Sequence, residues 1–315
     1  NGSAGIEYVK EINSAFITSG CVKNFGHKNI QGSIFLYEFH DKNKHYEAKK
    51  LSIAKPYDRK HFTPFGISSF VSKGRVILYV VNNYYVPSTI EVFQYDPAAI
   101  TLRHRKTIRS PMFKNLVDIV VVGADRFIVT SFVYNSYRSL QLLELAMQTP
   151  LGSLIYYDGK KSNYLERYFP TPSGLAIDKR NEILYVASTT EEIIRVYHFK
   201  KDMTISHQVD VNLLTSPINI FVDTDDDLWI SAQPVNYKAL QHLSYPIDPE
   251  YRSPSQVLRV KFQKDHKSWI ITEPYANDGA TLWGSSSVIF VKDQLLIGSL
   301  FGRLLHCNVD YPQLA

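Results

Sequence analysis

The sequence predicts an all-β protein, a six-bladed β-propeller with one or two short helices. Two observations predict this fold. The 21 Tyr and 17 Phe are many for a chain of 315 residues, and aromatic side chains suit pleated sheets. In addition, a unit of three short apolar strands with polar turns recurs along the chain, at a spacing close to the roughly 40–50 residues of a propeller blade. A β-sandwich also has many short strands, but it gives no reason for one unit to recur.

Residues 172–199 show the repeating unit most clearly. Strands are predicted at Leu175–Ile177, Ile183–Ala187 and Ile193–Phe199, separated by turns rich in polar residues. The other five segments with this layout are Ser14–Phe39, Phe65–Tyr95, Leu116–Tyr157, Ile218–Phe262 and Ser285–Asn308. We therefore expect residues 1–315 to form a single propeller domain.

Two stretches interrupt the repeat. Asn135–Gly152 has apolar residues at roughly helical spacing, which predicts an amphipathic helix. These residues are Leu140, Leu142, Leu143, Leu145 and Ala146. The helix either packs against the propeller, which we favour, or contacts a membrane or a partner. Gln233–Pro254 is rich in proline and is predicted to be a long surface loop, a kind of segment that often carries function.

The charge pattern does not favour a nucleic-acid partner. The formal net charge is +5, with acids and bases mixed along the chain. Basic residues concentrate in Asp41–Lys50 and His104–Arg109, which we interpret as solvated surface charge, because nucleic-acid binding requires one dense basic stripe. No apolar run is long enough to span a bilayer. The chain opens at Asn1 without Met, so we expect a leader or an N-terminal membrane anchor to lie upstream.

Two features near the chain ends bear on the compartment. Asn1-Gly2-Ser3 is a glycosylation sequon, which predicts a glycan on Asn1. Cys21 and Cys307 lie near opposite ends of the chain. In a cytosolic protein they would be two unrelated buried thiols, and in a secreted protein they could join the ends of the ring. Together with the sequon they favour an oxidising compartment.

The common signatures of catalysis are missing from the sequence. The ten histidines form no H-E-x-x-H or H-x-H pair, and there is no G-x-S-x-G or glycine-rich phosphate loop. Asp225–Asp227 is interpreted as a solvated β-turn. Function in a propeller more often lies where the inner strands meet the central channel. The residues to consider there are Ile6-Glu7, Phe65-Gly66, Val117-Asp118, Ser173-Gly174 and Ile218-Asn219.

Segments along nearly the whole chain resemble the paraoxonase/arylesterase family. They include INSAFITSG, FGISSF, KTIRSPMFKNLVDIVVVG, PSGLAIDKRNEILYVAS, NIFVDTDDDLWISAQP and LLIGSLFGRLLHC, in the order of the family. The resemblance implies a six-bladed propeller. It also implies a disulfide between the chain ends, for which Cys307 matches the family's C-terminal cysteine and Cys21 is a looser match.

The resemblance also implies where a catalytic centre would lie. Active members of the family hold a catalytic calcium ion with one Glu, three Asn and one Asp, and a histidine dyad assists hydrolysis of lactones and aryl esters. The matching calcium positions here are Ile6, Val117, Ser173, Ile218 and Asn219, and the histidine positions are Phe65 and Asn83. Only Asn219 is kept. Because calcium requires six to eight oxygen ligands and no general base remains, we expect a pseudoenzyme without catalytic calcium.

A second, structural calcium ion of the family is better matched. Its carboxylate positions correspond to Glu7 and Asp118, and its backbone carbonyl corresponds to Ile67. We therefore expect one structural calcium ion at most.

An inactive chain of this kind is similar to the nematode paraoxonase-like accessory proteins of degenerin (DEG/ENaC) mechanosensory channels. The similarity implies a non-enzymatic accessory subunit or chaperone, single-pass in the cell membrane or the endoplasmic reticulum, with the propeller outside the cell or in the lumen. Two alternatives stay open. One is a calcium-dependent lactonase or arylesterase with a rebuilt active site. The other is a carrier of an apolar ligand, bound at a channel mouth lined by Ile6, Phe65, Val117 and Ile218.

Overall fold

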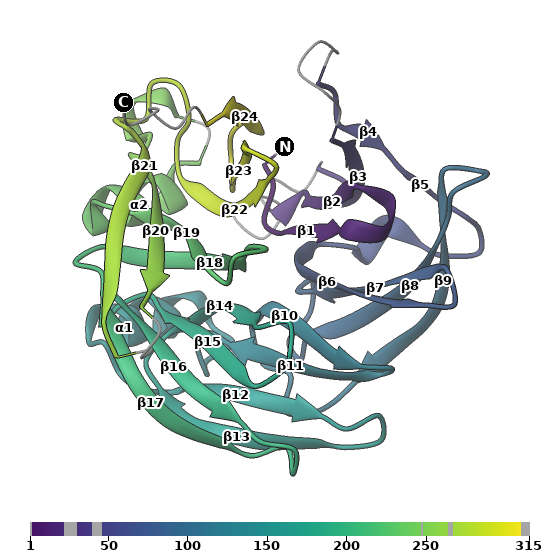
Figure 1. Cartoon of the computed structure of the whole chain (residues 1–315), viewed down its shortest axis with the longest axis horizontal. Coiled ribbons are helices and arrows are strands. Elements are labelled where there is room, and N and C mark those ends of the chain that lie inside the picture. Colours follow the sequence, from purple (N-terminus) through teal and green to yellow (C-terminus); the bar gives the residue numbers. More distant parts are fainter. Residues whose placement is uncertain (1, 22–29, 40–45, 247, 264–266, 310–315) are drawn as a thin grey trace.

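The computed structural model describes residues 2–21, 30–39, 46–246, 248–263 and 267–309. Six sheets surround a central channel, which confirms the predicted six-bladed propeller (Figure 1). The sheets follow one another along the chain, and we call them blades 1 to 6. The first long strand of each blade lies nearest the centre of the ring.

The strands of the first three blades alternate in direction, apart from one short parallel strand. Blade 1 contains β1 (Ile6–Val9), β2 (Ser14–Ser19), β3 (Ser33–Glu38) and β4 (Lys49–Lys50). Blade 2 contains β6 (Pro64–Ser72), β7 (Arg75–Asn82), β8 (Thr89–Asp96), β9 (Thr101–Arg109) and β5 (Ser52–Ile53), which pairs with β9 in parallel. Blade 3 contains β10 (Leu116–Gly123), β11 (Arg126–Ser131), β12 (Gly152–Tyr157) and β13 (Ser162–Phe169).

The last three blades have the same plan. Blade 4 contains β14 (Pro172–Ile177), β15 (Ile183–Ser188), β16 (Ile193–Phe199) and β17 (Ile205–Asn212). Blade 5 contains β18 (Ser216–Val222), β19 (Leu228–Gln233), β20 (Ser255–Phe262) and β21 (Trp269–Asn277). Blade 6 contains β22 (Ser285–Val291), β23 (Gln294–Ser299) and β24 (Leu305–Asn308). Among the described residues there are also three short 3-10 helices, η1 (Lys10–Ile12), η3 (Arg59–His61) and η4 (Pro249–Tyr251).

The hydrophobic core is divided among the interfaces between neighbouring blades. A separate cluster of buried side chains lies between each pair of blades, including the pair that closes the ring. At the closing interface, Ile17 of blade 1 packs in one cluster with Ile289 and Leu296 of blade 6. Burial of apolar surface of this kind is the main favourable contribution to folding. Packing between first and last blade therefore closes the ring.

Aspartate side chains shape the turns between the first two strands of blades 4 and 5. Asp178 accepts backbone hydrogen bonds from Glu182 and Ile183 through Oδ1, at 2.6 and 2.8 Å. Asp223 likewise accepts from Asp225 and Asp227, at 2.8 and 3.1 Å. Short polar side chains often satisfy turn backbones in this way. The aspartate run thus lies in the predicted turn, but the expectation of solvated side chains is wrong for Asp227, which is 2% exposed and pairs with Arg259 at 2.5 Å.

Helix α1 (Arg138–Ala146) lies in the segment predicted to be helical, but three of its four leucines are exposed. Leu140, Leu142 and Leu143 are 40%, 48% and 52% exposed. The buried residue of α1 is Glu144, whose carboxylate accepts hydrogen bonds from the backbone N–H groups of Tyr134 and Asn135, at 2.9 Å each. Gln141 also donates to Oδ1 of Asn115 at 3.2 Å. The helix therefore lies against the propeller, as favoured, but polar contacts rather than Leu140, Leu142 and Leu143 anchor it.

The segment 233–254 is not the loop that the sequence predicts, because it contains helix α2 (Asn236–Ser244) and η4. Pro234 and Pro246 lie outside the ends of α2, where they do not interrupt its hydrogen bonds. His242 anchors α2: its buried ring lies 4.7 Å from that of Phe301, and Nδ1 is 3.1 Å from Ser253 Oγ. Arg138 of α1 donates to the carbonyl of Leu243, at 3.4 Å, so the two helices are in contact.

The two cysteines are free thiols, so the disulfide implied by the family resemblance is not found. Cys21 Sγ lies 3.6 Å from the carbonyl of Leu300, beyond the end of β23, whereas Cys307 pairs with Leu295 near the start of β23. Five strand residues separate these points by roughly 17 Å, and a disulfide requires Cα atoms within about 7 Å. The predicted glycosylation residue, Asn1, lies outside the described residues.

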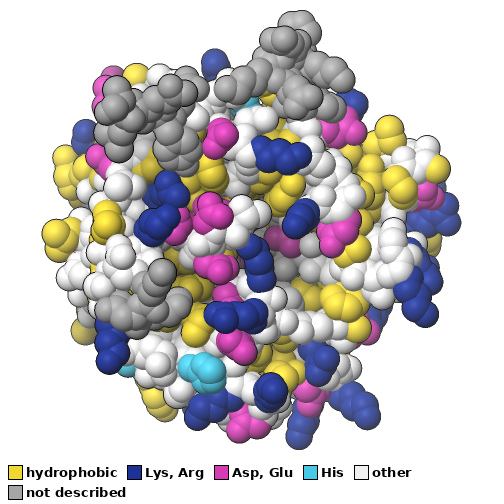
Figure 2. Space-filling model, viewed as in Figure 1, with side chains coloured by type: hydrophobic (Ala, Val, Ile, Leu, Met, Phe, Trp, Pro, Cys, Tyr) yellow, Lys and Arg dark blue, Asp and Glu magenta, His cyan; other side chains and the backbone are white. Residues whose placement is uncertain are grey.

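None of the helices in the described part of the chain has the length and apolar character needed to cross a bilayer. On the face shown in Figure 2, acidic and basic side chains are interspersed over the middle of the ring.

Candidate functional site

A cavity of about 220 Å³ lies in the central channel, lined by the inner strands β1, β6, β10, β14 and β18. Two glycines let these strands approach each other closely. A Cβ atom on Gly66 would lie 2.5 Å from Cα of Asp118, and one on Gly174 would lie 2.5 Å from Cα of Asn219. Neither glycine can therefore be replaced without moving a neighbouring strand. The glycines thus fix the positions of Asp118 and Asn219 beside the cavity.

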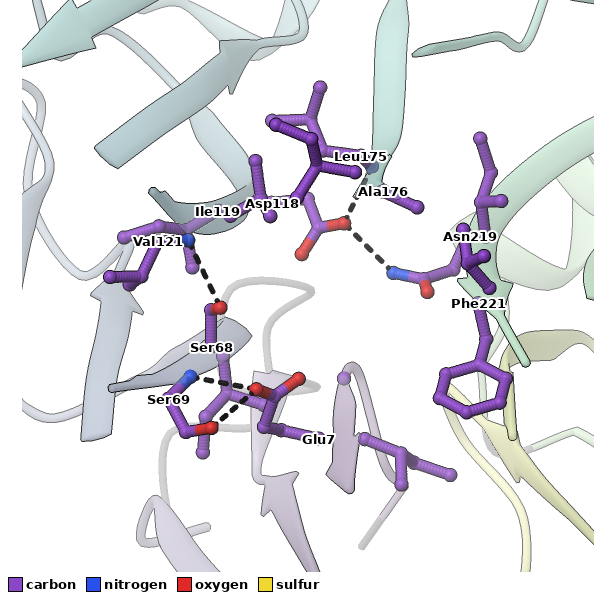
Figure 3. A pocket seen from close by; sticks show the side chains of 17 residues that line it. Glu7, Ser68, Ser69, Asp118, Ile119, Val121, Leu175, Ala176, Asn219 and Phe221 are labelled. Atoms are coloured by element: carbon purple, nitrogen blue, oxygen red, sulfur yellow. Dashed lines mark hydrogen bonds between the residues drawn. The ribbon is translucent and has the colours of Figure 1, made fainter. Parts of the chain in front are cut away.

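Glu7 reaches the cavity from β1. Its Oε1 accepts two hydrogen bonds from Ser69 of β6, one from the backbone N–H at 2.8 Å and one from the hydroxyl at 2.7 Å. Burial nevertheless raises the pKa of Glu7 to about 7, the bonds from Ser69 oppose this rise, and the nearby charge of Asp118 adds to it. Figure 3 shows the carboxylate between Ser69 and the open part of the cavity.

Asp118 reaches the cavity from β10 and is 5% exposed. Its Oδ2 accepts a hydrogen bond from the backbone N–H of Leu175, at 2.8 Å, and one from the side-chain amide of Asn219, at 3.1 Å (Figure 3). Burial raises the pKa of Asp118 to about 7, although these hydrogen bonds lower it. Two desolvated carboxylates therefore line one small cavity.

The carboxylates of Glu7 and Asp118 are the kind of ligand that binds a hard cation such as calcium. Oxygen ligands, including carboxylates and backbone carbonyls, are those that calcium prefers, and water can complete the coordination. Glu7, Asp118 and Ile67 all line the cavity, in agreement with their predicted grouping. Within the described residues, no three His, Cys, Asp or Glu side chains form a cluster that could hold a metal ion. A cation here would depend on two carboxylates and on neutral oxygens.

The positions matched to the catalytic calcium ion are not rebuilt as a metal site. Ile6 and Asn219 line the cavity, whereas Val117, Ser173 and Ile218 do not. Ile6 packs in the cluster between blades 1 and 6. The Ser173 hydroxyl donates to the carbonyl of Pro217 at 3.2 Å and lies 2.9 Å from the Thr189 hydroxyl, which is also 2.9 Å from that carbonyl, so a hydrogen-bond network between blades 4 and 5 holds it. The residues therefore do not fit a catalytic calcium ion.

The positions matched to the histidine dyad are also structural. The Phe65 ring packs against the cluster between blades 2 and 3. Asn83 lies outside the cavity, in the loop between β7 and β8, where its Oδ1 accepts a hydrogen bond from the hydroxyl of Ser88 at 2.8 Å. Neither side chain can take a proton from water at neutral pH.

The sequence did not reveal the role of Ser69, which holds Glu7 through two hydrogen bonds. Side chains alternate between the two faces of a strand, so Ile67 and Ser69 of β6, two residues apart, share a face. This alternation was the one signal in the sequence that placed Ser69 beside the cavity. Thr130 was also missed: its hydroxyl accepts from the backbone N–H of Asp118 at 3.1 Å and donates to the carbonyl of Ser173 at 2.7 Å. Only the packing of strands within a blade and between neighbouring blades reveals these contacts.

Comparisons with known proteins agree with this fold. A sequence model of the family described as Arylesterase matches residues 2–309. Mechanosensory abnormality protein 6 of Caenorhabditis elegans is 39% identical over 98% of this chain and 84% of its own length. Serum paraoxonase/lactonase 3 of Oryctolagus cuniculus is 30% identical over 98% of this chain and 86% of its own. A gluconolactonase structure from Xanthomonas campestris covers 94% of this chain and 82% of its own, with a TM-score of 0.57 and 13% identity, which indicates a shared fold alone.

Proposed function

Because the chain belongs to the arylesterase family, we propose that it is a non-enzymatic member that acts as an accessory subunit or chaperone of a degenerin-type membrane ion channel. Its place of action is the extracellular or luminal side of the cell membrane or the endoplasmic reticulum. The sequence similarity to nematode paraoxonase-like accessory proteins supports this proposal. So does the 39% identity to a protein named for a mechanosensory abnormality.

The main support for the proposal is the set of residues found at the positions that match the family's catalytic calcium site. Calcium in this family polarises the substrate carbonyl, which requires an ion with an open coordination position. Ile6, Val117 and Ile218 offer no side-chain oxygen, and the Ser173 hydroxyl is held between Pro217 and Thr189. The positions matched to the family's catalytic set therefore offer neither a Lewis acid site nor a base for the family's hydrolysis.

The same cavity does not favour the carrier alternative. Ligand pockets usually have volumes of about 300–1,000 Å³, and the central cavity has about 220 Å³. Of the four apolar residues expected at its mouth, only Ile6 lines it. Ile6 and Phe65 instead pack in the clusters between neighbouring blades.

We assign partner binding to a surface formed by α1 and α2, which we call the two-helix surface. Its exposed apolar residues are Tyr137, Leu140, Leu142, Leu143, Met147, Tyr237 and Leu240. Large apolar side chains that gather on a surface often mark an interaction site, and aromatic residues are enriched at protein interfaces. Because the leucines of α1 contribute little to the core, selection for folding does not explain them. We expect an apolar surface of the channel subunit to cover them.

The experiment is co-purification of the full chain with a degenerin subunit from detergent-solubilised cells. Leu140→Ser combined with Leu143→Ser should reduce recovery of the channel at least tenfold, while the melting temperature stays within a few degrees. Ile270→Ser is the matched control, because Ile270 is similarly exposed but lies on the outer strand β21. Point variants are preferable to deletion of residues 233–254, which would remove the buried His242.

Two results would contradict the proposal. Failure of the parent chain to associate with any membrane protein would exclude the accessory role. Equal loss of recovery in the Ile270 control would exclude the two-helix surface. The enzymatic alternative predicts a different result, namely lactone or aryl ester turnover with calcium that Asn219→Ala abolishes.

We also infer that Glu7 and Asp118, with the carbonyl of Ile67, hold one structural calcium ion. The support is chemical: two desolvated carboxylates with pKa values of about 7 line one cavity. A bound cation would neutralise both of them and join blades 1, 2 and 3. Calorimetric titration of the metal-free protein with calcium tests this inference. One site that Glu7→Gln removes supports it, and no binding at millimolar calcium contradicts it.

A further inference from the structure

A second cavity, of about 790 Å³, lies on blade 2, away from the central channel. Its floor is the end of the sheet where β7 finishes and β8 begins, and its outer wall is the segment Ala54–Asp58, which follows β5. The volume falls within the range of about 300–1,000 Å³ that is typical of small-molecule sites. None of the positions considered for the family's chemistry, Asn83 included, lines it.

The floor of this blade 2 cavity is a buried carboxylate with its hydrogen bonds satisfied. Glu91, 4% exposed, accepts from Thr89 at 2.7 Å and from Thr107 at 2.6 Å, and His104 Nε2 lies 2.8 Å from its Oε2. The His104 ring lies 4.6 Å from that of Tyr57 in the outer wall. The donors of this network compensate the charge of Glu91.

The rim of the cavity is basic. Lys55, Arg105 and Arg109 are exposed, line the cavity, and have no ion-pair partner among the described residues. A fourth cation, Arg103, is paired with Asp96 at 2.6 Å. Figure 2 shows Lys and Arg side chains along the outer edge of blade 2, on the right of the view. The basic run His104–Arg109, interpreted from sequence as solvated charge, thus borders a cavity.

The chemistry of the rim selects an anion. The acidic side chains that line the cavity are Glu91, which is compensated, and Asp58, whose Oδ1 accepts a hydrogen bond from the backbone of Lys60 at 2.9 Å. Guanidinium groups bind phosphate with two parallel hydrogen bonds. The aromatic rings of Tyr57 and Tyr85 line the same space and can contact the organic part of a ligand.

We propose that the blade 2 cavity binds a phosphorylated organic molecule. Arg105 and Arg109 bind the phosphate group, and Tyr57 and Tyr85 contact the remainder. The phosphate belongs either to a soluble molecule or to a lipid head group, and the two share this mode of recognition. The proposal is independent of the channel-accessory function, because the site lies outside the central channel and the two-helix surface.

Calorimetric titration of the full chain tests the proposal, with inorganic pyrophosphate, AMP and adenosine as soluble probes. Pyrophosphate and AMP should bind saturably, and adenosine should bind at least tenfold more weakly. Arg105→Gln or Arg109→Gln should each weaken AMP binding about tenfold. Lys106→Gln is the matched control on the same strand, because Lys106 pairs with Asp125 at 2.8 Å and does not line the cavity. Asp58→Asn should strengthen binding several-fold, since it removes a negative charge and keeps the acceptor oxygen.

The source of the phosphate is tested with vesicles of phosphatidylcholine, with or without a phosphatidylinositol phosphate. Vesicle binding that requires the phosphorylated lipid and is lost in the two arginine variants supports a lipid head group. AMP binding without vesicle binding supports a soluble ligand. The proposal is wrong if no phosphate-bearing probe binds at millimolar concentration, or if Lys106→Gln weakens binding as much as the arginine variants do.

Discussion

Asn219 on β18 donates a hydrogen bond of 3.1 Å to Oδ2 of Asp118 on β10, and so links blades 5 and 3 across the edge of the central cavity. Asn219 is the single side chain kept from the family's catalytic calcium set, and Asp118 matches the family's structural calcium set. The contact therefore gives the retained asparagine a structural role. It stabilises a buried carboxylate whose charge the cavity disfavours.

Replacing Asn219 by Ala should destabilise the protein at pH 8 by about 1–2 kcal/mol, because ionised Asp118 loses one of its donors. Chemical denaturation followed by circular dichroism measures the change. Asn163→Ala, at an exposed position on β13, should have an effect below about 0.5 kcal/mol. Equal stability of the two variants would show that the contact contributes nothing.

The central carboxylates should make stability depend on pH. Glu7 and Asp118 have folded pKa values of about 7, above the values of about 4 expected in the unfolded chain. The folded state therefore holds protons that the unfolded state has lost. Consequently, the contribution of these groups is fully present below about pH 4 and is lost as the pH rises through 7. Without calcium, Glu7→Gln should be more stable than the parent at pH 8 and nearly equal to it at pH 4.

Calcium should oppose that loss of stability. At about 100 times its Kd, a ligand that binds only the folded state adds about 2.7 kcal/mol to the free energy of unfolding. The increase should be larger at pH 8 than at pH 5, because calcium binds the ionised carboxylates. Thermal unfolding with and without calcium measures it, and Glu182→Gln, an exposed substitution, is the control. A calcium effect that Asp118→Asn leaves unchanged would contradict the assigned site.

His242 should give the free energy of unfolding a pH dependence opposite to that of Glu7 and Asp118. Burial, and to a smaller extent the charge of Arg252, lowers the pKa of His242 to about 4, whereas the unfolded value is about 6.5. The unfolded chain therefore takes up a proton first, and roughly 3 kcal/mol of stability is lost as the pH falls from 6.5 to 4. His242→Gln should flatten this part of the curve relative to the parent.

Glu144 should control the order of the two-helix surface. Its carboxylate accepts from the backbone N–H groups of Tyr134 and Asn135, so Glu144→Ala leaves two partly buried donors without this partner, at a cost of about 1–2 kcal/mol. Hydrogen exchange should accelerate in α1 and stay unchanged in the strands of blade 5. Recovery of the channel in the co-purification should also fall, because α1 forms part of the two-helix surface. The exposed Glu273→Ala is the control, and unchanged exchange in α1 would remove Glu144 from this role.

The blades and the inner-strand positions could be predicted from the sequence, because strand periodicity and turn residues are local signals. The anchoring of α1 could not, since helical spacing of Leu140 and Leu143 predicts burial while the buried contact is made by Glu144. The segment 233–254 was misread because prolines suggested a loop, yet they lie outside α2. The blade 2 cavity depends on the segment after β5 lying beside β9, a non-local pairing that no sequence pattern specifies.

The central claim is that the propeller serves a channel and not a reaction, and co-expression with a degenerin subunit tests it most directly. Whole-cell current should rise several-fold when the parent chain is present. The rise should persist in Asn219→Ala, which removes the last residue of the catalytic set, and should be lost in Leu140→Ser combined with Leu143→Ser. An unchanged current with the parent chain would contradict the account, and so would a rise in current that the two-helix variant retains and Asn219→Ala abolishes.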